Sequence, residues 1–252
     1  MFAAQRRHAI LERLRAHGSA TIAELTDAVD ASEVTVRRDL RALEADGLLV
    51  RRRGGASVIR TGPVGAGVPA LPQKRAIAEL AATLVEEGDA VLLGAGTTTQ
   101  QLADRLVGVR NLTVVTNSLL VSESLARSGE TGVVLTGGSV HGSSLALVGS
   151  AAEQSLAGLH ARRAFLSGAG LTPETGLSVT SMSAAGVDRA IAQAAAQVFA
   201  LVDSSKLGRD SLFRTVEPAR IAHLITDDGA DPETLDAIAR LGTVVHVARV
   251  SV

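Results

Sequence analysis

The chain has 252 residues, 46% of them hydrophobic and 2% aromatic, and a formal net charge of −1. This length suits one large or two modest domains with well-filled aliphatic cores, but the absence of Trp and Tyr leaves almost no side chains that could stack on single-stranded nucleic acid. The absence of Cys excludes a disulfide framework, a thiolate nucleophile and a Cys-based metal site.

The first segment is expected to form three short helices and a hairpin. A first apolar stripe at helical spacing ends at Gly18. Thr21 and Glu24 fit a capping box, in which each side chain satisfies an unpaired amide at the start of the second helix. Ser32 is expected to open the third helix. The apolar positions that the first two helices would bury are Ile10, Leu11, Leu14, Ile22, Leu25 and Val29.

The third helix, over residues 32–46, carries a candidate DNA-reading face. Val36, Leu40 and Leu43 fall on one side, so Val34 and the arginines face outward. Threonine and arginine near the start of such a helix suit the major groove, because arginine can pair with guanine through two hydrogen bonds. Taken alone, an arginine-rich outer face is more often only solvated. The residues expected to contact DNA from this helix are Ser32, Thr35, Arg37, Arg38 and Arg41.

A cationic hairpin is expected directly after this helix. The sequence from Leu48 onward indicates a strand, a turn at Gly54 and Gly55, and a second strand. Arg51, Arg52 and Arg53 would lie at the tip of the hairpin, where they could grip phosphates. A helix, a turn, a cationic helix and a cationic wing together favour a winged helix-turn-helix that binds double-stranded DNA.

Residues 60–72 are predicted to be a linker. Three of the six prolines of the chain and three glycines lie in this stretch, which suits neither a helix nor a central strand. The predicted division is a DNA-binding domain over 1–59, the linker over 60–72, and a larger domain over 73–252.

The larger domain is predicted to be a parallel α/β sheet. Seven apolar runs, with helical patterns such as 74–87 and 187–196 between several of them, indicate strands that helices cover on both faces. Ligands of such folds bind at the carboxyl ends of the strands. The runs are 90–94, 112–116, 132–136, 164–167, 198–203, 221–226 and 244–247.

Polar residues follow four of these strands and predict a site for a hydroxylated anion. Residues 94–100 combine glycines, three threonines and a helix start, which favours a phosphate, although a Thr-capped helix start explains the same residues. Lys206 would offer a point charge to the phosphate, and Asp203 could accept hydrogen bonds from sugar hydroxyls. The expected effector-binding residues are Gly96, Thr97, Thr98, Thr99, Asn117, Ser118, Gly137, Gly138, Asp203, Ser205 and Lys206.

Six ordered motifs resemble the DeoR family of transcriptional regulators. Residues 32–44, 47–49 and 53–56 resemble its winged helix, and residues 96–99, 114–119, 135–138, 147–149 and 203–206 resemble its sensor domain. The resemblance implies a doubly wound sensor fold related to ribose-5-phosphate isomerase. It also implies a repressor of carbohydrate or polyol catabolism that a phosphorylated sugar or polyol releases from its operator. The chain departs from the family at Asp188, where a Lys is usual, and lacks the Arg that commonly precedes the Lys74 helix.

A sugar-phosphate isomerase is the alternative, with Asp203 and Lys206 as an acid/base pair. It would leave the helix-turn-helix without a role, and a second carboxylate is not evident, so we expect a regulator and not an enzyme.

The six histidines have no metal-ligand spacing, and no cofactor or metal is expected. Neither a signal peptide nor a membrane span is evident, which predicts a soluble cytoplasmic protein. One short reading helix offers a small interface, so we expect a homo-oligomer.

Overall fold

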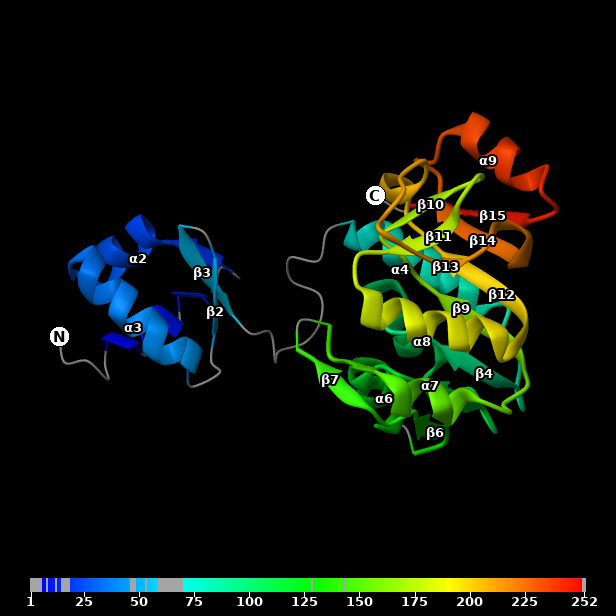
Figure 1. Ribbon diagram of the computed structural model, residues 1–252, viewed down its shortest axis with the longest axis horizontal. Helices are drawn as coiled ribbons and strands as arrows, with labels where there is room; N and C mark the ends of the chain where they lie inside the picture. Colours follow the sequence, from blue (N-terminus) through cyan, green and yellow to red (C-terminus); the bar gives the residue numbers. More distant parts are fainter. Residues whose placement is uncertain are drawn as a thin grey trace. The chain divides into compact units, whose positions relative to one another are not determined.

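The computed structural model describes residues 6–7, 9–11, 13–14, 19–45, 49–52, 54–58, 70–127, 129–142 and 144–250. The chain divides into two compact units, Met1–Pro69 and Ala70–Val252 (Figure 1). Most of the linker predicted over 60–72 lies outside the described residues. Its last part does not, because the second unit begins at Ala70.

The first unit contains a helical segment, two further helices and a three-stranded antiparallel sheet. The described residues between 6 and 14 are helical. They are followed by β1 (Ser19–Thr21), α2 (Ile22–Val29), α3 (Glu33–Ala45), β2 (Leu49–Arg52) and β3 (Gly55–Val58). The sheet order is β1-β3-β2. The predicted helices and hairpin are confirmed, whereas β1 was not predicted, because three residues are too few to show strand periodicity.

Local capping and burial explain why these helices form. The hydroxyl of Thr21 accepts a hydrogen bond from the amide of Glu24 at 3.2 Å, and the Glu24 carboxylate accepts one from the amide of Thr21 at 2.8 Å. This is the predicted capping box. The apolar faces meet in one core, in which the side chains of Ile10, Leu14, Leu25, Val36, Leu40 and Leu43 are at most 3% exposed.

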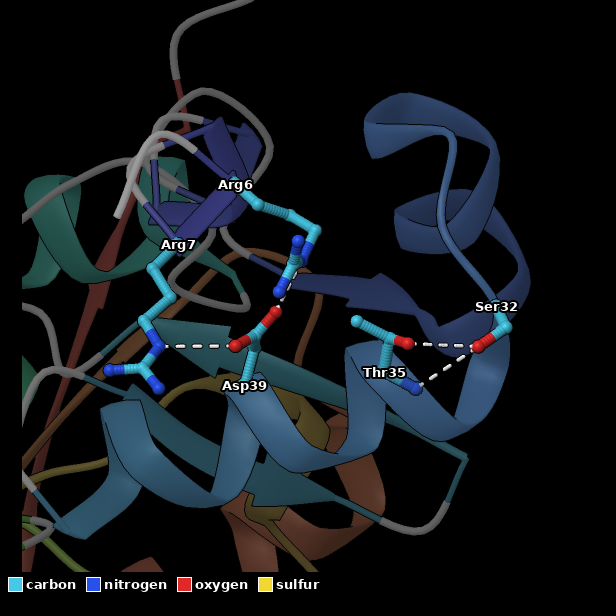
Figure 2. A network of polar contacts seen from close by, with 5 residues as sticks. All are labelled: Arg6, Arg7, Ser32, Thr35 and Asp39. Carbon is cyan, nitrogen blue, oxygen red and sulfur yellow. Dashed lines mark hydrogen bonds and ion pairs between the residues drawn. The ribbon is translucent and has the colours of Figure 1, made fainter. Parts of the chain in front are cut away.

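A buried ion-pair network joins the first helical segment to α3 (Figure 2). Asp39 is 2% exposed, and it accepts hydrogen bonds from Arg6 at 2.5 Å and from Arg7 at 3.1 Å. Burial alone would raise the pKa of Asp39, but the two guanidinium groups outweigh it and hold that pKa below its ordinary value. Asp39 therefore ties the orientation of α3 to the N-terminal segment.

We expect Asp39→Asn to destabilise the first unit by about 1–3 kcal/mol at neutral pH, because it removes a charged acceptor from two hydrogen bonds. A depressed pKa contributes stability above the ordinary carboxyl pKa of 3.8 and loses it as the pH falls through the folded value. The difference between variant and wild type should therefore shrink below that pH. Urea unfolding at several pH values checks this, with the exposed Asp27→Asn on α2 as control. An Asp39→Asn protein as stable as the control at neutral pH would contradict the role of the network.

The second unit is built on a seven-stranded sheet in which every neighbouring pair is parallel (Figure 1). From edge to edge the strands are β15 (Val244–Ala248), β14 (Ile221–Asp227), β12 (Ala195–Leu201), β9 (Ala161–Leu166), β4 (Ala90–Leu93), β5 (Thr113–Thr116) and β6 (Gly132–Leu135). Each apolar run of the sequence forms one of these strands, so the predicted parallel sheet is confirmed.

Helices cover both faces of this sheet, and successive residues of a strand enter opposite cores. In β9, Ala164 and Leu166 join one core, whereas Phe165 joins the other. The first core includes residues of α7 (Ser150–Leu156), α8 (Met182–Gln193) and α9 (Pro232–Ala239). The second includes residues of α4 (Leu71–Ala82), α5 (Thr97–Leu106) and α6 (Leu119–Ala126). This is the predicted doubly wound α/β class.

Two helices have bounds that differ from the prediction: α4 spans 71–82 where 74–87 was expected, and α8 spans 182–193 where 187–196 was expected. The helix α4 begins at Leu71, inside the predicted linker, because Pro72 fits the first turn of a helix, where its missing N–H costs no hydrogen bond. The helix α8 begins at Met182, where the Ser181 hydroxyl accepts a hydrogen bond from the Ala184 amide, and it ends at Gln193 instead of 196. Alanines lie on both sides of the boundary between α8 and β12. The sequence therefore does not show where the helix ends and the strand begins.

Smaller elements close the rim of the sheet and were not predicted. A hairpin joins β7 (Ser139–His141) to β8 (Ala146–Val148). A second small sheet contains β10 (Gly170–Thr172), β11 (Gly176–Val179) and β13 (Phe213–Val216), all antiparallel to their neighbours. These strands are three or four residues long and carry little periodicity of their own.

Candidate functional site

The outer face of α3 presents the predicted DNA-reading residues to solvent. Val34 is 79% exposed, and Arg38 and Arg41 are exposed and have no hydrogen bond or ion pair within the described residues. The hydroxyls of Ser32 and Thr35 are bonded to each other at 2.9 Å, and Ser32 also accepts the Thr35 amide (Figure 2). This cap starts the helix and keeps both hydroxyls near its N-terminus.

Arg37 differs from the other two arginines of this face because it pairs with Glu33, one turn earlier, at 3.3 Å. Both side chains are more than half exposed, so the pair contributes little and an incoming phosphate could displace it. The wing strand β2 contains Arg51 and Arg52, and Gly54 makes the turn with a φ of +87°. The side chains of Arg51 and Arg52, and all of Arg53, lie outside the described residues.

The second candidate site lies where the strand order of the large sheet reverses. From β4 the chain moves outward to β5 and β6, then returns to β9 on the other side of β4. The loops after β4 and β9 therefore diverge, and such a switch point is where doubly wound folds bind ligands. The loops come very close, since a Cβ on Gly96 would lie 2.1 Å from the Ser167 hydroxyl. A larger residue at position 96 would require the Ser167 side chain to move.

The helix α5 begins at this switch point without a side-chain cap. Gly96 is the N-cap residue, so no side chain occupies the amides of the first turn. Thr98 and Gln100 are buried, and Oγ1 of Thr98 and Oε1 of Gln100 have no hydrogen-bond partner within the described residues. Thr99 donates to the Gly96 carbonyl at 2.9 Å. Unoccupied amides at the start of a helix favour an anion such as phosphate.

Asn117 and Ser118 position the neighbouring loops. The Asn117 side chain accepts a hydrogen bond from the Ala95 amide at 2.9 Å and donates one to the Leu147 carbonyl at 3.1 Å. Ser118 caps α6 by accepting the Val121 amide at 3.2 Å. Both residues are 1% exposed. In this structure their side chains hold the rim together, and their contact with an effector stays a prediction.

The glycines after β6 form an open turn at the same end of the sheet. Gly137 and Gly138 are exposed and have φ values of +72° and +107°. A Cβ on Gly138 would lie 2.7 Å from the Val148 carbonyl oxygen, so the turn also requires a close backbone approach. The predicted set therefore shares one edge of the sheet, because the strands that precede it are parallel.

A buried carboxylate between two ammonium groups forms the charged part of the site. Oδ2 of Asp203 lies 3.9 Å from Nζ of Lys74 and 3.7 Å from Nζ of Lys206, and it has no hydrogen bond within the described residues. Lys206 donates to the Gly168 carbonyl at 2.8 Å. Ser205 donates to the other oxygen of Asp203. Asp203, Ser205 and Lys206 were predicted, and the structure brings them together.

Lys74 was not predicted as a site residue, although the sequence carried a signal for it. It is 4% exposed and lies on the buried face of α4 with Ile77, Ala78 and Ala81. A lysine on such a face needs an anion. Burial and then the Lys206 charge lower the pKa of Lys74, while Asp203 opposes them. Two ammonium groups therefore flank one buried carboxylate at this point.

Two other residues of the rim were also missed. Asp227, at the end of β14, accepts hydrogen bonds from the amide and the hydroxyl of Ser204, both at 2.7 Å. It thereby holds the short 3-10 helix Ser204–Lys206. Ser167, at the end of β9, contacts Gly96 as described above. Neither residue belongs to a motif that differs from an ordinary strand end.

The carboxyl group of Asp188 lies beside the loop that follows β4. It lies on α8, it is 6% exposed, and its Oδ1 is 3.7 Å from where a Cβ of Gly94 would be. Burial raises the pKa of Asp188 to about 7, and the charge of Arg189 offsets only part of this. The Arg189 guanidinium itself donates to the Arg214 carbonyl at 2.6 and 3.0 Å. Arg189 therefore does not replace the Lys that the family resemblance leads one to expect at position 188.

A helix-turn-helix with an exposed arginine face, joined to an α/β unit with a polar switch-point site, defines a ligand-responsive DNA-binding regulator. Residues 6–61 match the DeoR-like helix-turn-helix domain, and residues 70–228 match the DeoR C terminal sensor domain. The chain belongs to the DeoR family of transcriptional regulators, as its motifs predict.

Relatives align with nearly the whole chain. The uncharacterized HTH-type transcriptional regulator YgbI of Escherichia coli (strain K12) is 35% identical over 99% of both chains. The putative aga operon transcriptional repressor of Escherichia coli O157:H7 is 32% identical over 96% of this chain and 92% of its own. The lactose phosphotransferase system repressor of Lactococcus lactis subsp. lactis is 32% identical over 94% and 95%.

Among solved structures, ribose 5 phosphate isomerase A from Neisseria gonorrhoeae aligns with 53% of this chain and 52% of its own, at 18% identity and a TM-score of 0.39. This likeness is too weak to carry an argument about the reaction or the ligand. Within the described residues, no helix is long and apolar enough to cross a membrane. The same residues contain no cluster of three or more His, Asp or Glu arranged to hold a metal ion.

We expect Asp188→Asn to stabilise the ligand-free protein above neutral pH. An unfolded Asp ionises near 3.8, whereas the folded one holds its proton to about 7, so wild-type stability falls as the pH rises through this window. A shift of roughly three units corresponds to at most about 4 kcal/mol. Urea unfolding at several pH values should show the gain above neutral pH and its disappearance below about pH 4. The exposed Asp236→Asn on α9 is the control, and identical pH slopes for all three proteins would contradict a buried ionisable Asp188.

Proposed function

We propose that this protein is a repressor of carbohydrate or polyol catabolism genes that a phosphorylated sugar or polyol releases from its operator. The observation that carries the proposal is the pairing of an uncapped α5 start with the Lys74–Asp203–Lys206 cluster on one rim of the sensor unit. The helix start and the two ammonium groups suit a phosphate, and the carboxylate and backbone groups suit hydroxyls. Relatives named as repressors of the aga operon and of the lactose phosphotransferase system support it.

The proposed division of labour follows the two units. The first unit, with α3 in the major groove and β2–β3 on the phosphate backbone, reads the operator. The second unit binds the effector and provides the surface through which copies assemble. Assembly is part of the proposal because one α3 helix offers too little interface for tight binding, whereas two helices on repeated half-sites offer enough.

A ligand can release the operator only if it binds the DNA-free state more tightly than the DNA-bound state. By the same linkage, operator DNA must weaken effector binding by the factor with which the effector weakens DNA binding. This reciprocity distinguishes a regulator from a protein with two unrelated binding sites.

Replacing Arg38 by Ala tests the reading helix. Its guanidinium is exposed and has no partner within the described residues, and we propose that it contacts a base edge, so the substitution should cost about 1–3 kcal/mol of operator affinity, concentrated at one base position. Fluorescence anisotropy with a set of single-base operator variants measures this. Arg127→Ala, on the surface of the second unit, is the control. An equal loss on every operator variant would instead make Arg38 a phosphate contact.

Replacing Lys206 by Ala tests the effector site. It removes one of the two cations beside Asp203, and we expect it to weaken binding of a sugar or polyol phosphate about tenfold or more. Calorimetric titration of a panel of such phosphates, with and without operator DNA, measures both affinity and coupling. Binding unaffected by DNA would leave a pocket without a switch. Isomerisation of ribose 5-phosphate that disappears in the variant would support an enzyme instead.

A further inference from the structure

The carboxyl group of Asp188 is the one charged side chain of the sensor site that the proposed function leaves without a role. Asp188 is 6% exposed, and within the described residues its oxygens make no hydrogen bond or ion pair. Unpaired carboxylates are rarely buried, because removing the charge from water costs several kcal/mol unless a partner replaces the hydration. A buried group of this kind beside a ligand-binding loop indicates that the ligand supplies the partner.

Within the described residues, no cation forms an ion pair with Asp188, and the charge of Arg189 compensates only part of the cost of its burial. Arg189 is the nearest in sequence, but its guanidinium donates to the Arg214 carbonyl through two hydrogen bonds. The ammonium groups of Lys74 and Lys206 lie beside Asp203. Each neighbouring cation therefore already has an oxygen partner, and the Asp188 carboxyl is left facing Gly94.

The carboxyl group of Asp188 lies beside the loop on which the proposed phosphate site begins. Gly94 is the first residue after β4, and two residues later Gly96 begins the uncapped turn of α5. The amide of Ala95, between them, is held by Asn117. A phosphate on the first turn of α5 would thus lie on the same short loop that Asp188 contacts from the α8 side.

We propose that Asp188 makes the sensor selective for an effector that carries an ammonium group as well as a phosphate, that is, a phosphorylated amino sugar. A hydroxyl group would give the carboxyl a hydrogen bond but leave its charge uncompensated in a buried place. An ammonium group provides both the hydrogen bond and the opposite charge, and charge-assisted hydrogen bonds are the stronger ones. The proposal rests on the proposed function and specifies its ligand.

The test compares matched ligands that differ only in the amino group. Glucosamine 6-phosphate and galactosamine 6-phosphate are titrated calorimetrically into the full-length protein beside glucose 6-phosphate and galactose 6-phosphate, at about pH 8, where Asp188 is ionised. At least one amino sugar phosphate should bind about tenfold or more tightly than its hydroxyl counterpart. Asp188→Asn should remove this preference, whereas the exposed Asp236→Asn should retain it.

The outcomes separate this inference from the proposed function. Equal affinity for the aminated and unaminated members of each pair would overturn the role of Asp188 and leave a sugar-phosphate sensor. Binding of none of the four phosphates would overturn the role of Asp188 and count against the sugar-phosphate site as well. Should Asp188→Asn fail to fold, the comparison of paired ligands on the wild-type protein decides the question alone.

Discussion

The chain leaves β4 toward one edge of the sheet and leaves β9 toward the other. The polar residues of the sensor unit lie at the end of the sheet where these two connections diverge. A parallel sheet covered on both faces has no surface for a ligand except its edges and its strand ends. At the divergence, Gly96 lies so close to Ser167 that a Cβ would displace the Ser167 hydroxyl, and Asn117 accepts a hydrogen bond from the Ala95 amide of the same loop. The charged groups of Lys74, Asp203 and Lys206 belong to the same end of the sheet. Their shared place follows from strand direction and not from local sequence.

Hydrophobic periodicity and the composition of the strand ends made the parallel sheet and most of the polar loops at its carboxyl end predictable. The inner strands of the sheet are largely apolar because helices cover both of their faces, and the partly exposed edge strands β6 and β15 are also rich in valine, so the sequence displayed each of them. The recognition helix was equally visible, because its buried face repeats at 3.6 residues per turn. What escaped prediction depends on pairs of distant residues: Arg6 and Arg7 with Asp39, Lys74 with Asp203, and Asp227 with Ser204. A charged residue in such a pair has the same local sequence as one in solvent, except where, as at Lys74, it interrupts an apolar stripe.

The buried carboxyl groups of the two units differ in whether the protein supplies their hydrogen-bond partners. In the first unit, Asp39 is buried with its two arginines already in place, which orders the segment that carries α3 before any DNA arrives. In the second unit, Asp188 and Oδ2 of Asp203 are buried without hydrogen-bond partners within the described residues. The first arrangement stabilises a rigid binding surface. The second arrangement leaves carboxyl oxygens that the proposed effector could satisfy, and such a ligand would stabilise the state of the sensor that binds it.

The rim residues lie far apart in the sequence, and this separation affects when the site can form during folding. Lys74 lies near the beginning of the second unit and Lys206 near its end, with five strands of the sheet contributed by the chain between them. Contacts between such distant residues form late in folding, because closing a long loop costs conformational entropy before the contact contributes any stability. During synthesis, a chain still held on the ribosome can complete the N-terminal DNA-binding unit while the sensor is unfinished. For that interval, a newly made chain would have a folded reading helix but would lack the unit through which we propose that copies assemble and the effector binds.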